Sequence, residues 1–131
     1  MKRILLVEDR DDDIVLARRV IVKILGNCEI AVARDGEEAL LFLRDPSCGV
    51  FDLIFLDIQL PGIDGFSVLD GIRSDGRLKN QPVIMLTTSS HPEDMARAKL
   101  LGAKLYFVKP LGYKEFEKEM ARVLGKFFTV A

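Results

Sequence analysis

Five short apolar segments, separated by stretches with helical periodicity, are the feature that most restricts the fold of this chain. The sequence predicts strands at residues 4–7, 30–33, 51–56, 82–86 and 105–108. These segments are apolar at most positions rather than alternating, which is typical of strands buried on both faces of a parallel sheet. The alternation of such strands with helices predicts a single α/β domain.

A helix is predicted after each strand, because apolar residues recur there at helical spacing. The first helix is expected to begin at the caps Asp11-Asp12-Asp13 and to end at Gly26, and the second to begin at Asp35 with Glu38 and to end near Asp45-Pro46. The third is expected from about Gly65 to Ser74, and the fourth from Ser90-His91-Pro92-Glu93 to Gly102. The fifth is predicted from the apolar series Phe116, Met120, Val123, Leu124 and Phe127. Five strands suit an open doubly wound sheet better than an eight-stranded barrel, which needs about 250 residues. We therefore expect a flavodoxin-like α/β fold with strand order 2-1-3-4-5, helices one and five covering one face and helices two to four the other.

Composition limits the possible functions. The formal net charge of −1 gives no long-range attraction to nucleic acid or anionic lipid. No apolar stretch approaches the ~20 residues that a bilayer requires, and Met1-Lys2-Arg3 leads directly into the first strand without a signal-peptide pattern. Cys28 and Cys48 match neither a CxxC pair nor a disulfide framework. We expect one domain, residues 1–131, located in the cytoplasm, with reduced cysteines and no direct nucleic-acid or membrane partner.

Chemically functional side chains stand where four of the predicted strands end. Glu8 and Asp9 follow the first strand, Asp57 the third, Thr87 the fourth and Lys109 the fifth. The carboxyl ends of parallel strands form the crevice where ligands bind, and close carboxylates repel unless a cation lies among them. Oxygen ligands of this kind suit Mg²⁺, while an ammonium and a hydroxyl suit a transferring phosphoryl group. The pattern indicates phosphoryl transfer onto a carboxylate.

Several short segments, in their order and spacing, carry a likeness to a known family. They are Ile4 to Asp9; Asp52 to Asp57; Pro61-Gly62 with Asp64-Gly65; Leu86-Thr87; Gly102-Ala103; and Lys109-Pro110. On these segments the chain resembles the receiver domain of two-component response regulators along nearly its whole length. Residues 86–90 are similar to those of the small stand-alone regulators that partner phytochrome-type sensor kinases.

The resemblance implies a phosphoacceptor and a metal site. Asp57 would accept a phosphoryl group from a phosphohistidine of a sensor histidine kinase. Mg²⁺, or Mn²⁺, would be held by Asp9, Asp57 and the backbone carbonyl of Gln59, with Glu8 binding through the metal's waters. The chain would then be a signalling phosphoacceptor with intrinsic self-phosphorylation and autodephosphorylation chemistry rather than an enzyme.

The resemblance also implies switching residues. Lys109 would contact the phosphoryl oxygens, Thr87 would hydrogen-bond one of them, and the rotamer of Tyr106 would follow Thr87. Gln59 and Ser89 would flank the path of the hydrolytic water and tune dephosphorylation. The phosphoryl group adds about −1.5 to −2 charges, which can switch the surface formed by helix four, strand five and helix five.

Other positions carry further expectations. The resemblance favours a cis Lys109–Pro110 bond. The side chain of Arg10 either reaches the phosphoryl group or points to solvent, and we favour the second alternative. The last helix has a basic stripe, expected as a solvated face paired with Glu115 and Glu119 or, alternatively, as a docking or homodimer surface beside an exposed Phe128. The stripe consists of Lys114, Lys118, Arg122 and Lys126.

The sequence is less consistent with three other functions than with signalling. A hydrolase of the haloacid-dehalogenase type needs a second Asp two residues after the nucleophile, where this chain has Gln59, and no cap domain is found. A nucleotide- or flavin-binding module needs a phosphate-binding loop after strand one, where residues 8–13 are mainly acidic. A phosphate-independent pseudo-receiver usually has a damaged site, whereas this one is complete.

Overall fold

One five-stranded parallel sheet organises the protein. The computed structural model describes residues 1–128, with strands β1 (Lys2–Val7), β2 (Cys28–Ala33), β3 (Leu53–Leu56), β4 (Val83–Thr87) and β5 (Leu105–Val108). The order is β2-β1-β3-β4-β5 and every pair is parallel, which confirms the predicted topology. β3 begins two residues later than predicted, because the Arg3 N–H donates to the Asp52 carboxylate (2.8 Å) before the regular ladder starts.

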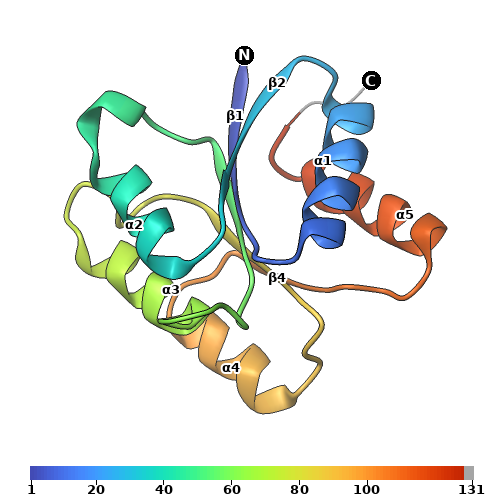
Figure 1. Ribbon diagram of the computed structural model, residues 1–131. Coiled ribbons are helices and arrows are strands. Elements are labelled where there is room, and N and C mark those ends of the chain that lie inside the picture. Colours follow the sequence, from blue (N-terminus) through green and yellow to red (C-terminus); the bar gives the residue numbers. More distant parts are fainter. Residues whose placement is uncertain (129–131) are drawn as a thin grey trace.

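Helices cover both faces of this sheet. They are α1 (Asp11–Leu25), α2 (Gly36–Arg44), α3 (Gly65–Ser74), α4 (Pro92–Leu100) and α5 (Tyr113–Leu124), with a short 3₁₀ helix, η1 (Pro46–Cys48), that was not predicted. Figure 1 shows α1 and α5 together on one side and α2, α3 and α4 on the other, as expected from right-handed crossovers. None of the helices within residues 1–128 has the length and apolarity that a membrane crossing requires.

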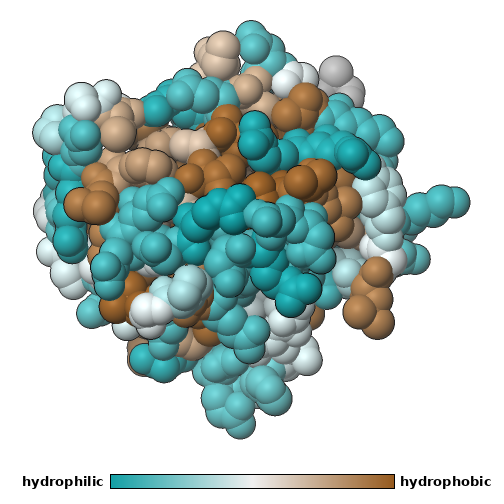
Figure 2. Space-filling model, in the orientation of Figure 1, coloured by the Kyte–Doolittle hydropathy of each residue, from teal (hydrophilic) through white to brown (hydrophobic). Residues whose placement is uncertain are grey.

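Two apolar cores, one on each face, explain why the strands lack polar alternation. Along β1, Ile4 and Leu6 belong to the core under α1 and α5, whereas Leu5 and Val7 belong to the core under α2, α3 and α4. Polar side chains cover most of the face in Figure 2, with hydrophobic groups between them. The sheet is thus held from both sides, and its strand ends have fixed positions.

Helix starts confirm some predicted caps and correct others. The Asp35 carboxylate accepts the Glu38 N–H (2.7 Å) at α2, as predicted. The residue before α1 is Arg10, with no side-chain cap, so the three aspartates occupy the first turn, where the helix dipole favours them. The residue before α4 is His91 rather than Ser90, because Pro92 takes the first helical position.

Two expectations beyond the fifth strand were wrong. The Lys109–Pro110 bond is trans, the isomer that X–Pro bonds prefer by about 0.5–1 kcal/mol. Phe128 is half-buried against the α1–α5 core rather than exposed. Its N–H donates to the Leu124 carbonyl (2.9 Å), so a further turn carries the ring back towards the sheet, where Lys2 Nζ lies 5.7 Å from its centroid.

Gly65 lets α3 start directly against the end of β3. Its N–H donates to the Ile58 carbonyl (2.8 Å), and a Cβ there would lie 2.1 Å from the Asp57 carbonyl oxygen and 2.8 Å from the Ile58 Cα. These neighbours are backbone atoms, which cannot rotate away. Only glycine therefore allows α3 to approach the Asp57 backbone this closely.

Replacing Gly65 with Ala should lower the free energy of unfolding by about 3 kcal/mol, since the added methyl must displace the backbone next to Asp57. Urea unfolding measures the change. Gly76→Ala is the matched control, because a Cβ there meets no atom within 4 Å, and it should stay within about 0.5 kcal/mol of wild type. Equal stability of the two variants would contradict the packing argument.

Candidate functional site

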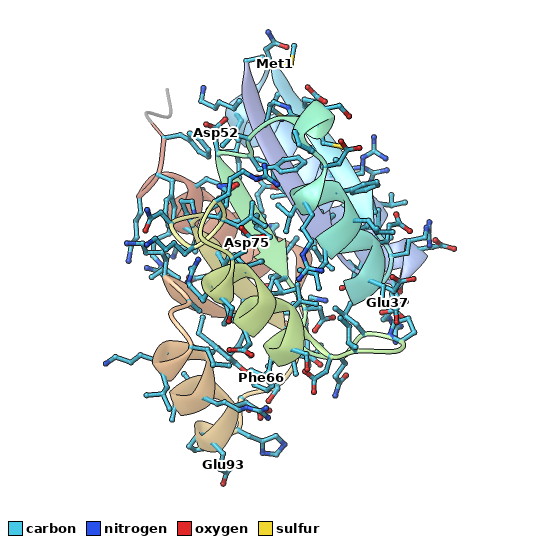
Figure 3. The ribbon with its side chains drawn as sticks, turned by 90° about the vertical axis from the view of Figure 1, so that its left-hand side faces the viewer. Met1, Glu37, Asp52, Phe66, Asp75 and Glu93 are labelled. Atoms are coloured by element: carbon cyan, nitrogen blue, oxygen red, sulfur yellow. The ribbon has the colours of Figure 1, made fainter. Side chains whose placement is uncertain are left out.

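The candidate site lies at the carboxyl edge of the sheet. Because β1, β3, β4 and β5 are consecutive and parallel, the residues that follow them meet at one edge. Figure 3 shows Met1 and Asp52, which precede β1 and β3, at the end of the molecule opposite Phe66 and Glu93. The structure therefore brings the predicted strand-end residues to a common edge.

A buried ion-pair cluster occupies this edge. The Lys109 ammonium bonds to Glu8 Oε1 and lies 3.4 Å from Asp57 Oδ2 and 3.3 Å from Asp13 Oδ2. The side chains of Lys109, Glu8 and Asp57 are 11%, 3% and 9% exposed. An ammonium has three N–H donors, so each carboxylate can take one. Three of the predicted site residues are thus in direct contact.

Asp13 is the member of this cluster that sequence reasoning missed. The sequence pattern predicts Asp13 only as a helix cap, yet its carboxylate reaches Lys109 from the first turn of α1. Asp13 precedes the buried Ala17 and Val20 at spacings of four and seven. This periodicity places Asp13 on the inner face of α1 and is the signal that could have revealed it.

Electrostatics keep Lys109 charged. Burial by itself would lower the pKa of Lys109, but the hydrogen bond to Glu8 and the charges of Asp57, Glu8 and Asp13 outweigh it and raise that pKa. Burial raises the pKa of Glu8, and Lys109 opposes this effect. Glu8 consequently depends on Lys109 to remain ionised in the folded protein.

The remaining oxygen donors lie around the cluster. Glu8 Oε2 accepts the N–H groups of Asp9 (2.9 Å) and Arg10 (3.2 Å), and Asp57 Oδ1 accepts that of Gln59 (3.2 Å). Asp9 and Gln59 are exposed. Across residues 1–128, no three His, Cys, Asp or Glu side chains converge to enclose a metal ion.

Thr87 and Tyr106 are joined through Ser89. The fully buried Thr87 accepts the Ser89 N–H on Oγ1 (3.3 Å), and the half-buried Tyr106 donates its hydroxyl to the Ser89 carbonyl (3.0 Å). Burial raises the pKa of that hydroxyl. Ser89 Oγ itself donates to Asp94 Oδ2 in the first turn of α4 (2.6 Å). This chain of bonds connects the strand-end threonine to α4.

The structure also shows where Arg10, His91 and the basic stripe of α5 lie. Arg10 is exposed and pairs with Asp12 (3.6 Å) and Asp13 (3.5 Å), so it lies towards solvent as favoured. His91 is an exposed residue, also as expected. On α5, Arg122 pairs with Glu119, which supports the solvated-face interpretation for part of the basic stripe.

Comparisons with known proteins agree with this geometry. The family model described as the response regulator receiver domain matches residues 4–121. A probable methanogenesis regulatory protein, FilR2 of Methanothrix harundinacea (strain 6Ac), is 34% identical over 92% of this chain and 79% of its own length. The chain spans less than half of some other relatives, 44% of one and 13% of another, so those likenesses concern one part of longer proteins.

Solved structures give the same result. The Mn²⁺-bound form of response regulator Rcp1 superposes with a TM-score of 0.90 at 32% identity, over 100% of this chain and 98% of that one. The phosphorylated cyanobacterial phytochrome response regulator RcpA gives a TM-score of 0.89 at 32% identity, over 98% and 97%.

Replacing Lys109 with Met should lower the free energy of unfolding near pH 7 by about 3 kcal/mol, because buried carboxylates lose their shared cation. The pKa of Glu8, already raised by burial, should rise further above its unfolded value. Glu8 then binds its proton more tightly in the folded state, so stability falls as pH rises and the deficit shrinks near pH 4.5.

Urea unfolding with a chelator present, at both pH values, tests this prediction. Lys104→Met is the control, since Lys104 is exposed, and should be nearly neutral. A Lys109→Met deficit that is the same at both pH values would argue against the proposed dependence of Glu8 on Lys109.

Proposed function

Because the chain belongs to the response regulator receiver domain family, we propose that Asp57 is its phosphoacceptor in two-component signalling. Family membership implies a sensor kinase as partner, and a phosphohistidine of that kinase is the proposed donor. The observation that carries this proposal is the contact between the Lys109 ammonium and the buried Asp57 carboxylate, 3.4 Å from Nζ to Oδ2.

The transfer follows from these two groups. An Asp57 oxygen attacks phosphorus, the new O–P bond forms as the P–N bond of phosphohistidine breaks, and the histidine nitrogen keeps the electron pair. Lys109 shifts a hydrogen bond from Asp57 to a phosphoryl oxygen and balances the added negative charge. Because Lys109 is already charged and held within this distance, little reorganisation is needed.

The oxygen donors also fit a divalent cation, Mg²⁺ or Mn²⁺. Asp9 and Asp57 offer carboxylates and Gln59 a backbone carbonyl, and Mg²⁺ is commonly bound by one or two carboxylates with waters and a phosphoryl oxygen. When bound, such an ion supplies positive charge next to the phosphoryl oxygens. Asp9 makes no side-chain hydrogen bond or ion pair with the rest of residues 1–128, which leaves it available. Glu8 is used by Lys109 and two N–H groups, so its binding through water stays a prediction.

The switch is proposed to act through Thr87. Its hydroxyl would leave the Ser89 N–H and hydrogen-bond the phosphoryl group, which frees the Ser89 backbone and with it the Tyr106 hydroxyl. The hydroxyl of Ser89 is held by Asp94, so any effect on the hydrolytic water would require this bond to open. Gln59 is exposed beside Asp57 and is the more accessible residue for tuning dephosphorylation.

The proposed function also includes the domain organisation, location and output of the chain. The chain would be one receiver domain, residues 1–131, acting as a phosphoacceptor with its own phosphorylation and dephosphorylation chemistry rather than as an enzyme. A cytoplasmic location is proposed because both Cys28 and Cys48 are free thiols, as expected in a reducing compartment. Output would pass to a protein target through the surface of α4, β5 and α5.

Acetyl phosphate with Mg²⁺ should add the mass of one phosphoryl group to the wild type and none to Asp57→Asn. Intact-protein mass spectrometry measures the gain. Asp70→Asn, which changes an exposed carboxylate on α3, should label like wild type. A wild-type protein that never gains mass would instead indicate a phosphate-independent pseudo-receiver.

A homodimer through α4, β5 and α5 is a further prediction. On this surface a groove of about 440 Å³ lies between α4 and β5, lined largely by apolar groups including Met95, which is 42% exposed. With beryllofluoride as phosphoryl mimic, light scattering at micromolar concentration should show a dimer that Met95→Glu disrupts. Leu41→Glu, on α2, should leave it intact. A monomer with and without the mimic would exclude this dimer.

A further inference from the structure

We propose that Asp13 is a positioning residue for Lys109 and directs the lysine ammonium towards Asp57. The inference deepens the proposed function, since it rests on the roles given there to Asp57 and Lys109. Nothing in the receiver resemblance assigns a role to this position. It is carried instead by a contact found in the structure, 3.3 Å between Asp13 Oδ2 and Lys109 Nζ.

Lys109 has as many N–H donors as it has carboxylate neighbours. The ammonium of Lys109 has three N–H bonds, and it faces Glu8, Asp13 and Asp57. If Glu8 and Asp13 each accept one, the third is directed at Asp57, where the phosphoryl group would arrive. Without Asp13, one N–H turns to water, and the flexible lysine stem regains rotational freedom.

Asp13 is itself held in place. It belongs to the first turn of α1, whose next turns pack Ala17 and Val20 into the core. On its outer side the same carboxylate oxygen lies 3.5 Å from Arg10 Nε. Asp13 is 28% exposed in its side chain, whereas the neighbouring Asp12 is 74% exposed. The packing of α1 thus places the carboxylate of Asp13 at the site and leaves those of Asp11 and Asp12 in solvent.

This contrast provides a matched pair of variants. Asp13→Ala and Asp12→Ala each remove one carboxylate from the same helical turn and one partner of Arg10, so they change the net charge alike. Asp12→Ala also removes the acceptor of the Asp13 N–H, a bond that does not involve Lys109. Only Asp13→Ala removes a contact with Lys109. Asp13→Glu keeps the carboxylate and serves as the conservative rescue.

The first measurement reports on Lys109 without any phosphorylation. The ¹⁵N signal of its ammonium, assigned as the lysine signal that is missing in Lys109→Arg, should shift and exchange faster with solvent in Asp13→Ala. In Asp12→Ala it should match the wild type, and in Asp13→Glu it should move back towards it. An ammonium signal that is unchanged in Asp13→Ala would overturn the inference.

The second measurement is the rate of labelling by acetyl phosphate with Mg²⁺. Asp13→Ala should label about two to five times more slowly than Asp12→Ala, the range expected for one partly exposed ion pair. Asp13→Glu should recover most of the rate. Equal rates for the two alanine variants, or faster labelling of Asp13→Ala, would overturn the positioning role.

The two proposals fail separately. If the wild type labels at Asp57 but Asp13→Ala behaves like Asp12→Ala, only the role of Asp13 is lost. If the wild type never labels, the phosphoacceptor proposal fails, while the ammonium signal still decides whether Asp13 positions Lys109.

Discussion

The Lys109 ammonium, placed among three carboxylates, is the interaction on which this site depends. Glu8 and Asp57 are almost fully buried at adjacent strand ends, where two negative charges would repel and each would lose hydration. Lys109 offsets both costs, since it bonds to Glu8 and lies 3.4 Å from Asp57. The same cation is the group that a transferring phosphoryl oxygen needs. The Lys109 side chain therefore contributes both to the stability of the folded protein and to the proposed phosphorylation of Asp57.

The fold explains why these groups meet. The order β2-β1-β3-β4-β5 makes the strands that carry Glu8, Asp57, Thr87 and Lys109 consecutive, and the cores on both faces fix their ends. Gly65 brings α3 against the Asp57 backbone, and the first turn of α1 presents Asp13 to Lys109. From Thr87, the bonds to Ser89 and on to Asp94 lead into α4. A change at Thr87 thus has a physical connection to a surface helix.

Sequence patterns predicted most of this arrangement because they depend on local periodicity. Apolar strands and the residues that end them sufficed to place Asp57, Glu8, Thr87 and Lys109 at one edge. Asp13 was missed because a cap and a ligand of Lys109 look alike in sequence, and only the rotation of α1 separates them. Phe128 is half-buried and not exposed as predicted, because the chain makes one more turn after Leu124. Ser90 is not the residue before α4, because Pro92 takes the first helical position. The rotation of α1 is set by packing against segments distant in the sequence, whereas the other two outcomes depend on the local backbone after Leu124 and at Pro92.

The most direct test of the central claim is to locate the acyl phosphate. After phosphorylation with a small phosphodonor and Mg²⁺, borohydride reduction converts a phosphorylated aspartate to homoserine, which peptide mass spectrometry can assign to a position. The account predicts homoserine at residue 57 and at no other aspartate. Homoserine at Asp9 or Asp13, or a phosphoryl group retained on a serine, threonine or on His91, would contradict it.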